Sequence, residues 1–239
     1  MKNDFVDHYL SEYMNEKNAI SSSLFKEGSQ LFTAENLQEF TWMGRELYMR
    51  GLATSHGGNM SITDGKYIWI TRAGASLANL QPSDVVMATW NPDEDPTKVS
   101  TEATAHHAIY RGAATYAKNI GMSYGNMAII HALSPYVLFR SMVDDEIYSV
   151  DGESNYVLGE STPVVKIPGE PVAREAAKIF EEVAAEGVQI FAVRRHGAFA
   201  IAPTLERAQR LVTCLEQTSK ILTMFEQTGR KFNPSDFAK

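Results

Sequence analysis

Two histidines in this sequence each follow an apolar run that is typical of a buried strand. His131 comes after "MAII" and His196 after "IFAV", and a turn is expected after each of them. A single histidine of this kind is usually a satisfied residue at the rim of a core. Two in matching positions favour one shared site, where imidazole nitrogens hold a metal ion or move a proton.

A carboxylate and further polar groups accompany the histidines in "STEATAHHAIY", residues 100–110. Glu102 and His106 are four residues apart and therefore share one face of the helix expected here. This pair suits a metal-ligand pair or a proton relay, and equally a solvated helix pair. Ser100 and Thr101 stand where the helix should begin, so their hydroxyls and the first free amides form an anion-binding corner or simply a cap.

Two glycine turns offer backbone amides to a ligand. In "GGNMS", residues 57–61, Gly58 allows close approach of the backbone and Asn59 adds an amide donor. In "ITRAG", a strand ends at Gly74 and its amides can face an anion. Each stretch, taken alone, is also an ordinary turn beside a strand.

The elements that must position these groups alternate between strands and helices. Thr33 is a plausible N-cap for a helix that Gly51 ends. Apolar periodicity predicts further helices and strands. The helices cover 101–119, 170–187 and 203–227, and the strands cover 65–74, 83–90, 126–133, 164–168 and 188–197. We therefore predict an N-terminal extension over 1–33 and one α/β domain over 34–239, with a mostly antiparallel or mixed sheet covered by helices.

Composition excludes several classes of partner. The net charge is −7 and the basic residues are scattered, which argues against nucleic acid and favours a small-molecule partner. No window approaches the roughly 18 apolar residues of a membrane span, and the N-terminus has no apolar signal core. Cys214 is the single cysteine. It rules out an intrachain disulfide and a cysteine-rich zinc site, and it fits a reducing, cytoplasmic compartment.

The order and spacing of these stretches resemble the class II aldolase/adducin family. The stretches are "GLATSHGGNMSI", "WITRAG", "SDVV", "STEATAHHAIY", "IIHALSPY" and "VRRHGAFAIAPTLERA", and they span about residues 35–225. The resemblance implies a central, largely antiparallel sheet and a ring-like homotetramer with active sites between subunits. It also implies a divalent metal, usually zinc, held by an H-x-H pair and a later histidine. A glutamate at a helix start serves as acid/base, and glycine and serine turns hold a phosphate.

By this resemblance, Glu102 matches the acid/base, and His131 and His196 match two of the metal ligands. The positions that match the phosphate site are Gly58, Asn59, Gly74, Ser100 and Thr101.

Three departures from the family pattern stand out. Leu133 replaces the second histidine of the pair, Ala73 replaces the hydroxyl residue before Gly74, and "AKNIGMSYGN" looks like an insertion. The two residues of an H-x-H point to one face of a strand, and leucine has no lone pair to offer. A catalytic zinc normally has three protein ligands.

We therefore expect Glu102 to join His131 and His196 as a permanent third ligand, in a site that suits zinc, manganese or ferrous iron. His106 and His56 remain alternative ligands. As a full-time ligand, Glu102 is a poorer general base, and the proton transfer then passes to another group.

The function expected from these residues is that of a metal-dependent, aldolase-type lyase. Its substrate would be a small sugar phosphate or a related hydroxy-carbonyl compound, and the metal would stabilise an enediolate. Epimerisation, dehydration and decarboxylation pass through related intermediates, so they stay open. The alternative is a non-catalytic, adducin-like binding or structural protein without a metal, which Leu133, Ala73 and the inserted stretch favour.

Overall fold

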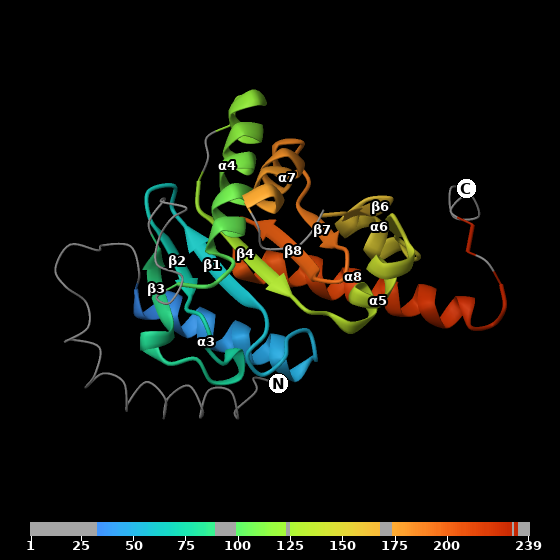
Figure 1. The fold of residues 1–239 in the computed structure, drawn as a ribbon, viewed down its shortest axis with the longest axis horizontal. Coiled ribbons are helices and arrows are strands. Elements are labelled where there is room, and N and C mark those ends of the chain that lie inside the picture. Colours follow the sequence, from blue (N-terminus) through green and yellow to red (C-terminus); the bar gives the residue numbers. More distant parts are fainter. Residues whose placement is uncertain (1–32, 89–98, 123–124, 168–173, 231, 234–239) are drawn as a thin grey trace.

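The structure is a computed structural model of the chain, and it describes residues 33–88, 99–122, 125–167, 174–230 and 232–233. Element labels are those of Figure 1. The predicted N-terminal extension lies outside the described residues except for Thr33. The ends of three predicted elements also lie outside them, at 89–90, 168 and 170–173.

The described strands form one sheet in the order β3-β2-β1-β4-β8-β7-β6-β5. Neighbouring strands are antiparallel, except that β6 and β7 run parallel. The predicted mostly antiparallel sheet is therefore confirmed. The strands are β1 Asn59–Thr63, β2 Ile68–Thr71, β3 Val85–Ala88, β4 Met127–Ala132, β5 Glu146–Tyr148, β6 Ser161–Val165, β7 Ile190–Val193 and β8 Gly197–Ala202.

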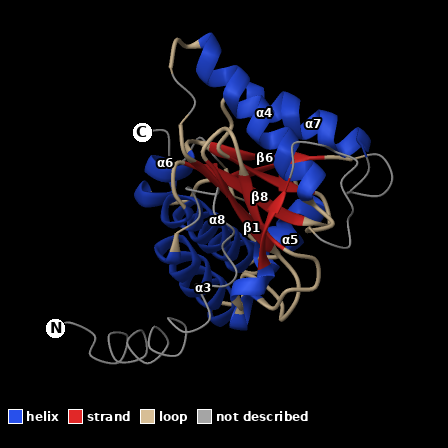
Figure 2. Cartoon of the chain, turned by 90° about the vertical axis from the view of Figure 1, so that its left-hand side faces the viewer, coloured by secondary structure: helices blue, strands red, loops and turns tan. Residues whose placement is uncertain are grey.

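Helices cover both faces of the sheet, as predicted. One face carries α3 (Ala34–Met49) and α8 (Leu205–Glu226), and the other carries α4 (Ala103–Asn119) and α7 (Arg174–Ala185) (Figures 1 and 2). The shorter helices are α5 Pro135–Val143, α6 Gly152–Leu158, and the 3₁₀ turns η1 Leu77–Asn79 and η2 Pro82–Asp84. Within the described residues, no helix is both long and apolar enough to cross a membrane.

Two hydrophobic cores lie on the two sides of the sheet, and β4 contributes to both. Ala128 and Ile130 pack into the core beneath α3 and α8, whereas Ile129 packs into the core beneath α4 and α7. Successive side chains of a strand point to opposite faces. His131, the next residue in this alternation after Ile130, therefore points toward α4.

The predicted helices are present, and the N-cap of α3 is the one expected from sequence. Thr33 forms a capping box with Asn36 at the start of α3. Thr204 accepts from the backbone N–H of Arg207 at the start of α8. Sequence reasoning missed several short elements, because their patterns are weak. These are β1, β5, β8, α5 and α6.

Candidate metal centre

Three side chains from three separate elements meet above the middle of the sheet. Glu102 is the N-cap of α4, His131 belongs to β4, and His196 lies in the turn between β7 and β8. One Glu102 oxygen, Oε2, lies 2.5 Å from Nδ1 of His131. The other, Oε1, lies 2.9 Å from Nε2 of His196. Among the described residues these three form a cluster whose ligand atoms all lie within 4.8 Å of one another.

Glycine at position 197 lets the β7–β8 turn close against β4. Gly197 has a φ of +106°, and a Cβ on it would lie 2.2 Å from the carbonyl oxygen of Ala132. Any larger residue would push the turn away, and L-residues rarely adopt this φ. The close approach brings the rings of His196 and His131 into a stack with centroids 4.8 Å apart. Arg195 in the same turn is also left-handed, with a φ of +64°.

The cluster of three side chains is buried at His131 and Glu102 and partly exposed at His196. His131 is 2% exposed and stacks on Phe199, with ring centroids 4.3 Å apart. Glu102 is also buried. The side chain of His196 is 18% exposed, so a ligand from solvent reaches the cluster on the His196 side.

Glu102 is held as a carboxylate. Its burial alone would raise its pKa, because burial disfavours the charged form. The nearby charge of His131 and hydrogen bonds from His131, His196 and Asn59 outweigh burial and hold the pKa well below its usual range. The side chain therefore offers two anionic oxygens rather than a proton.

The hydrogen bonds of His131 identify which of its nitrogens faces the cluster. Nε2 lies 3.1 Å from the backbone carbonyl of His196, which can only accept, so Nε2 carries a hydrogen. Nδ1 then points to Glu102. A carbonyl partner of this kind fixes ring orientation and tautomer, as it does in many metal-ligating histidines.

This donor set fits a divalent ion. Two imidazole nitrogens and one carboxylate are ligands that suit zinc, manganese or ferrous iron. Glu102, which the sequence leads us to expect as the third ligand, lies beside the two histidines. His56 is exposed and its Nδ1 contacts Ser55. His106 is fully buried behind Asn59, with its Nε2 2.5 Å from Oδ1 of Asn59. Neither alternative histidine joins the cluster.

Sequence reasoning missed two residues behind the cluster, Ser61 and Tyr110. Ser61 Oγ lies 2.7 Å from Nδ1 of His106 and 2.8 Å from the Tyr110 hydroxyl. Two signals pointed to them. Ser61 is two residues after Asn59 on a strand, and Tyr110 is four residues after His106 on a helix, so each shares a face with a residue already singled out.

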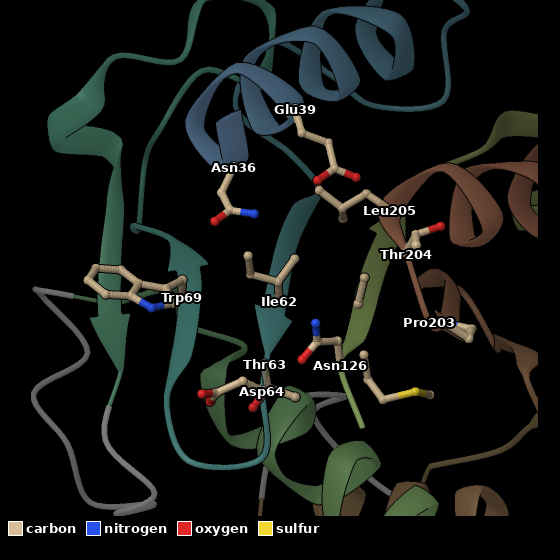
Figure 3. A pocket seen from close by; sticks show the side chains of 12 residues that line it. Asn36, Glu39, Ile62, Thr63, Asp64, Trp69, Asn126, Pro203, Thr204 and Leu205 are labelled. Atoms are coloured by element: carbon tan, nitrogen blue, oxygen red, sulfur yellow. The ribbon is translucent and has the colours of Figure 1, made fainter. Parts of the chain in front are cut away.

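A separate surface pocket lies at the other end of β1 and β4. Asn59 pairs with His131 at one end of these strands, and Thr63 pairs with Met127 at the other. At about 3.3 Å per residue, the two ends are about 13 Å apart. The pocket has a volume of about 200 Å³, and Figure 3 shows Thr63, Glu39 and Trp69 among its lining side chains. It is therefore distinct from the cluster of Glu102, His131 and His196.

Comparison with known proteins identifies the family. Residues 38–223 match the family described as the Class II Aldolase and Adducin N-terminal domain. The chain belongs to this family. The predicted family and fold class are thereby confirmed.

Relatives within the family carry the names of sugar-phosphate aldolases. The chain is 31% identical over 123 residues to a protein named L-fuculose phosphate aldolase from Methanococcus maripaludis, a match that covers 52% of this chain and 63% of that relative. A protein of the same name from Methanocaldococcus jannaschii is 26% identical over 168 residues, covering 70% and 84%. The crystal structure of L-fuculose-1-phosphate aldolase from Thermus thermophilus superposes with a TM-score of 0.70 at 26% identity, covering 82% of this chain and 97% of that one. The first relative is thus matched over less than two thirds of its length.

Two of the segments that match the family's phosphate positions lie side by side. The backbone N–H of Ala73 donates to the carbonyl of Val99, which joins the turn at Gly74 to the segment that holds Ser100. Gly74 is exposed and left-handed, with a φ of +69°. Ser100 is buried, and its Oγ accepts from the backbone N–H of Glu102.

The other three positions that match the family's phosphate site have different surroundings. Thr101 is exposed beside Ser100. Gly58 is left-handed, with a φ of +89°, and lies against the carbonyl of His131. The Asn59 amide is buried and donates to Glu102, so this side chain contacts the candidate metal ligands.

Proposed function

We propose that the protein is a divalent-metal-dependent lyase that cleaves a carbon–carbon bond in a small sugar phosphate. The observation that carries this proposal is the cluster of Glu102, His131 and His196 in a member of the class II aldolase and adducin family. A family member that had lost its chemistry would not be expected to keep a buried carboxylate between two histidines.

The residues of the cluster have distinct roles in this proposal. His131, His196 and Glu102 would hold the ion. A bound divalent ion supplies Lewis acidity, which stabilises the negative charge that develops on the carbonyl oxygen of the substrate. Glu102 is anionic and its pKa is held low, so it would act as a ligand, and proton transfer would pass to another group. His196, the more exposed histidine, borders the side from which the substrate enters.

The substrate's phosphate is proposed to bind next to this cluster. The backbone amides at Gly58 and Gly74 and the groups of Ser100 and Thr101 supply donors without a fixed charge. The adjacency of the Gly74 turn and the Ser100 segment supports this role, because one anion can contact both. The names of the relatives favour L-fuculose 1-phosphate or a similar ketose 1-phosphate as the first substrate to test.

Two further expectations belong to the same proposal. A homotetramer follows from the family resemblance, and a cytoplasmic location follows from the single cysteine. Both are checked directly, by light scattering and by cell fractionation.

The metal is tested first, by elemental analysis of protein purified without a metal-binding tag. We expect about one zinc, manganese or iron per chain, as one site predicts. The His196→Ala variant should lose it, and the His56→Ala variant should keep it, since His56 lies outside the cluster. No metal in the wild type, and none taken up from micromolar zinc or manganese, would favour the non-catalytic, adducin-like alternative.

The reaction is tested on the metal-loaded protein with L-fuculose 1-phosphate. Cleavage releases an aldehyde and a triose phosphate, and both are followed by coupled assays. Activity that is lost in His196→Ala supports the proposal. A metal-bound protein that instead exchanges a substrate proton with solvent, without cleavage, would favour epimerisation.

A further inference from the structure

We propose that Tyr110, Ser61 and His106 are positioning residues that hold the Asn59 amide in one orientation, and that this amide sets the metal affinity of the cluster. The inference rests on the proposed metal site and extends it to three residues that touch neither metal nor substrate. Their contacts form one chain of hydrogen bonds between α4 and β1.

The hydrogen bonds run without interruption from Tyr110 on α4 to the carboxylate of Glu102. The Tyr110 hydroxyl lies 2.8 Å from Ser61 Oγ, and Ser61 Oγ lies 2.7 Å from Nδ1 of His106. Nε2 of His106 lies 2.5 Å from Oδ1 of Asn59. Nδ2 of Asn59 donates to Oε2 of Glu102 over 2.8 Å.

Spacing explains why these five side chains meet. Glu102, His106 and Tyr110 are each four residues apart and lie on one face of α4, or at its start. Asn59 and Ser61 are two residues apart and point to one face of β1. The helix lies over this strand face, so the two rows of side chains alternate along a single line.

The direction of each hydrogen bond follows from the carboxylate end. The Glu102 oxygens only accept, so the Asn59 amide nitrogen faces them and its oxygen faces His106. Nε2 of His106 must therefore carry a hydrogen. His106 is neutral, because burial lowers its pKa to about 3 despite the Glu102 charge. Its Nδ1 then accepts from Ser61, and Ser61 in turn accepts from Tyr110.

Burial makes this direction hard to reverse. Ser61, His106 and Tyr110 are all 0% exposed, so water cannot replace a missing partner. The His106 ring also packs edge-on against Phe199, with centroids 5.9 Å apart. If the Asn59 amide flipped, its oxygen would face the Glu102 carboxylate, and this buried acceptor would have no donor.

The amide orientation matters to the metal ligands because Asn59 touches two of them. Besides Glu102, its Nδ2 lies 3.3 Å from Nδ1 of His131. A fixed amide therefore restrains both the carboxylate and the imidazole. Loss of such supporting groups typically lowers metal affinity by about 10–100-fold.

The test compares zinc affinity in variants that each remove a different member of this series of hydrogen bonds. We expect His106→Leu to weaken zinc binding by about 10–100-fold, since it removes the donor to Asn59. His106→Gln keeps an amide N–H near the position of Nε2, and it should recover most of the affinity. Tyr110→Phe, which removes only one hydroxyl, should have the smallest effect, and Ser61→Ala an intermediate one.

Affinity is measured by competition with a chromogenic chelator at constant pH, and thermal unfolding of the metal-free variants reports folding separately. A purely structural role would lower stability without this ranking of affinities. Nitrogen-15 NMR of the wild type should show His106 as the neutral tautomer with hydrogen on Nε2.

Each alternative outcome has a separate meaning. If the wild type binds zinc and all four variants bind it within about twofold, the positioning role is wrong and the metal centre stands. A wild type that binds no zinc overturns the metal centre and this inference together. Hydrogen on Nδ1 of His106 in the wild type contradicts the direction of the chain, even if zinc binds. If His106→Leu does not fold, Tyr110→Phe and Ser61→Ala decide the question.

Discussion

Nδ1 of His131 lies 2.5 Å from Oε2 of Glu102, although the carboxylate oxygen can only accept a hydrogen bond. The opposite nitrogen of His131, Nε2, already carries a hydrogen for the carbonyl of His196. A hydrogen bond between the two therefore requires a hydrogen on Nδ1 of His131. A divalent ion held by His131 and Glu102 would displace that hydrogen.

This arrangement predicts that metal binding releases about one proton per ion. His196 can supply Nε2 to the ion by a change of tautomer, so it adds no further proton. Isothermal titration calorimetry in buffers of different protonation enthalpy measures the count. His196→Asn should weaken binding but leave the count unchanged. A count of zero would mean that Nδ1 of His131 carries no proton to displace.

A histidine in place of Leu133 is predicted to restore a further ligand. Leu133 lies over Gly57, where a Cβ would be 2.6 Å from its Cδ1, and it directly follows β4. Residues two apart on an extended chain share a face, so the introduced imidazole would lie on the side of His131. We expect Leu133→His to tighten zinc binding by about tenfold, or about 1.4 kcal/mol.

The matched control is Leu133→Asn, which is polar and similar in size but a poor zinc ligand. The same chelator competition measures both variants. If Leu133→His also makes Glu102→Gln able to hold zinc, the new histidine has taken over the role of the carboxylate. Equal affinities in the histidine and asparagine variants would show that position 133 cannot reach the ion.

Sequence was sufficient for the fold class. The three residues of the cluster were singled out by local patterns together with the resemblance to the class II aldolase/adducin family. The α8 helix has a long apolar period and a Thr204 cap. His131 and His196 each end an apolar run, and Glu102 lies at a helix start. None of these inferences required knowledge of which strands are neighbours.

What sequence could not provide depends on the packing of distant segments. The neutral state of His106 depends on its complete burial, and its partner Ser61 is 45 residues away in the chain. The strand β8, "GAFAIA", was missed because its alanines have low β propensity, although all six of its residues are buried. Its pairing with β4 places Phe199 under His131.

Substitution of Gly197 by alanine is predicted to disrupt the turn that carries His196. The added Cβ would lie 2.2 Å from the carbonyl of Ala132, and the φ of +106° is unfavourable for alanine. We expect a loss of at least about 2 kcal/mol in the free energy of unfolding, together with loss of metal. Urea denaturation and metal analysis measure the two effects.

Gly159→Ala is the matched control for this prediction. Gly159 has a φ of +80°, but nothing lies within 4 Å of a Cβ built on it. Its substitution should cost only the strain of the backbone conformation, about 1–3 kcal/mol, and should leave the metal in place. If both variants lose the same free energy of unfolding and have the same metal content, the contact with Ala132 is not the reason that position 197 requires glycine.

A capping interaction supplied by a distant residue is predicted to stabilise α5, which begins shortly after His131. The Glu216 carboxylate of α8 accepts from the backbone N–H groups of Tyr136 and Val137, at 3.1 and 3.0 Å. Ser134, at the N-cap position, makes no side-chain cap. Glu216→Ala should therefore lower the free energy of unfolding by about 1–2 kcal/mol. Glu216→Gln keeps an acceptor and should lose less. Equal losses would show that the charge, and not the hydrogen bond, provides the stabilisation.

Acid sensitivity is predicted to arise in part from His107, which lies on α4 away from the cluster. It is 1% exposed, and burial together with the nearby charge of Arg111 lowers its pKa to about 4. An unfolded histidine titrates near 6.5, so between about pH 4 and 6.5 the unfolded state binds the extra proton. Stability is then complete above pH 6.5 and falls as the pH drops toward 4.

From these values, His107 accounts for a loss of about 2 kcal/mol between pH 7 and 5. His107→Gln cannot titrate, so its free energy of unfolding should fall by about that much less over the same interval. Urea denaturation in the presence of a chelator measures this without a contribution from metal binding. The exposed His56→Gln variant serves as control and should follow the wild type. If His107→Gln and the wild type lose stability in parallel, His107 is protonated in the folded protein, and its burial does not govern the acid response.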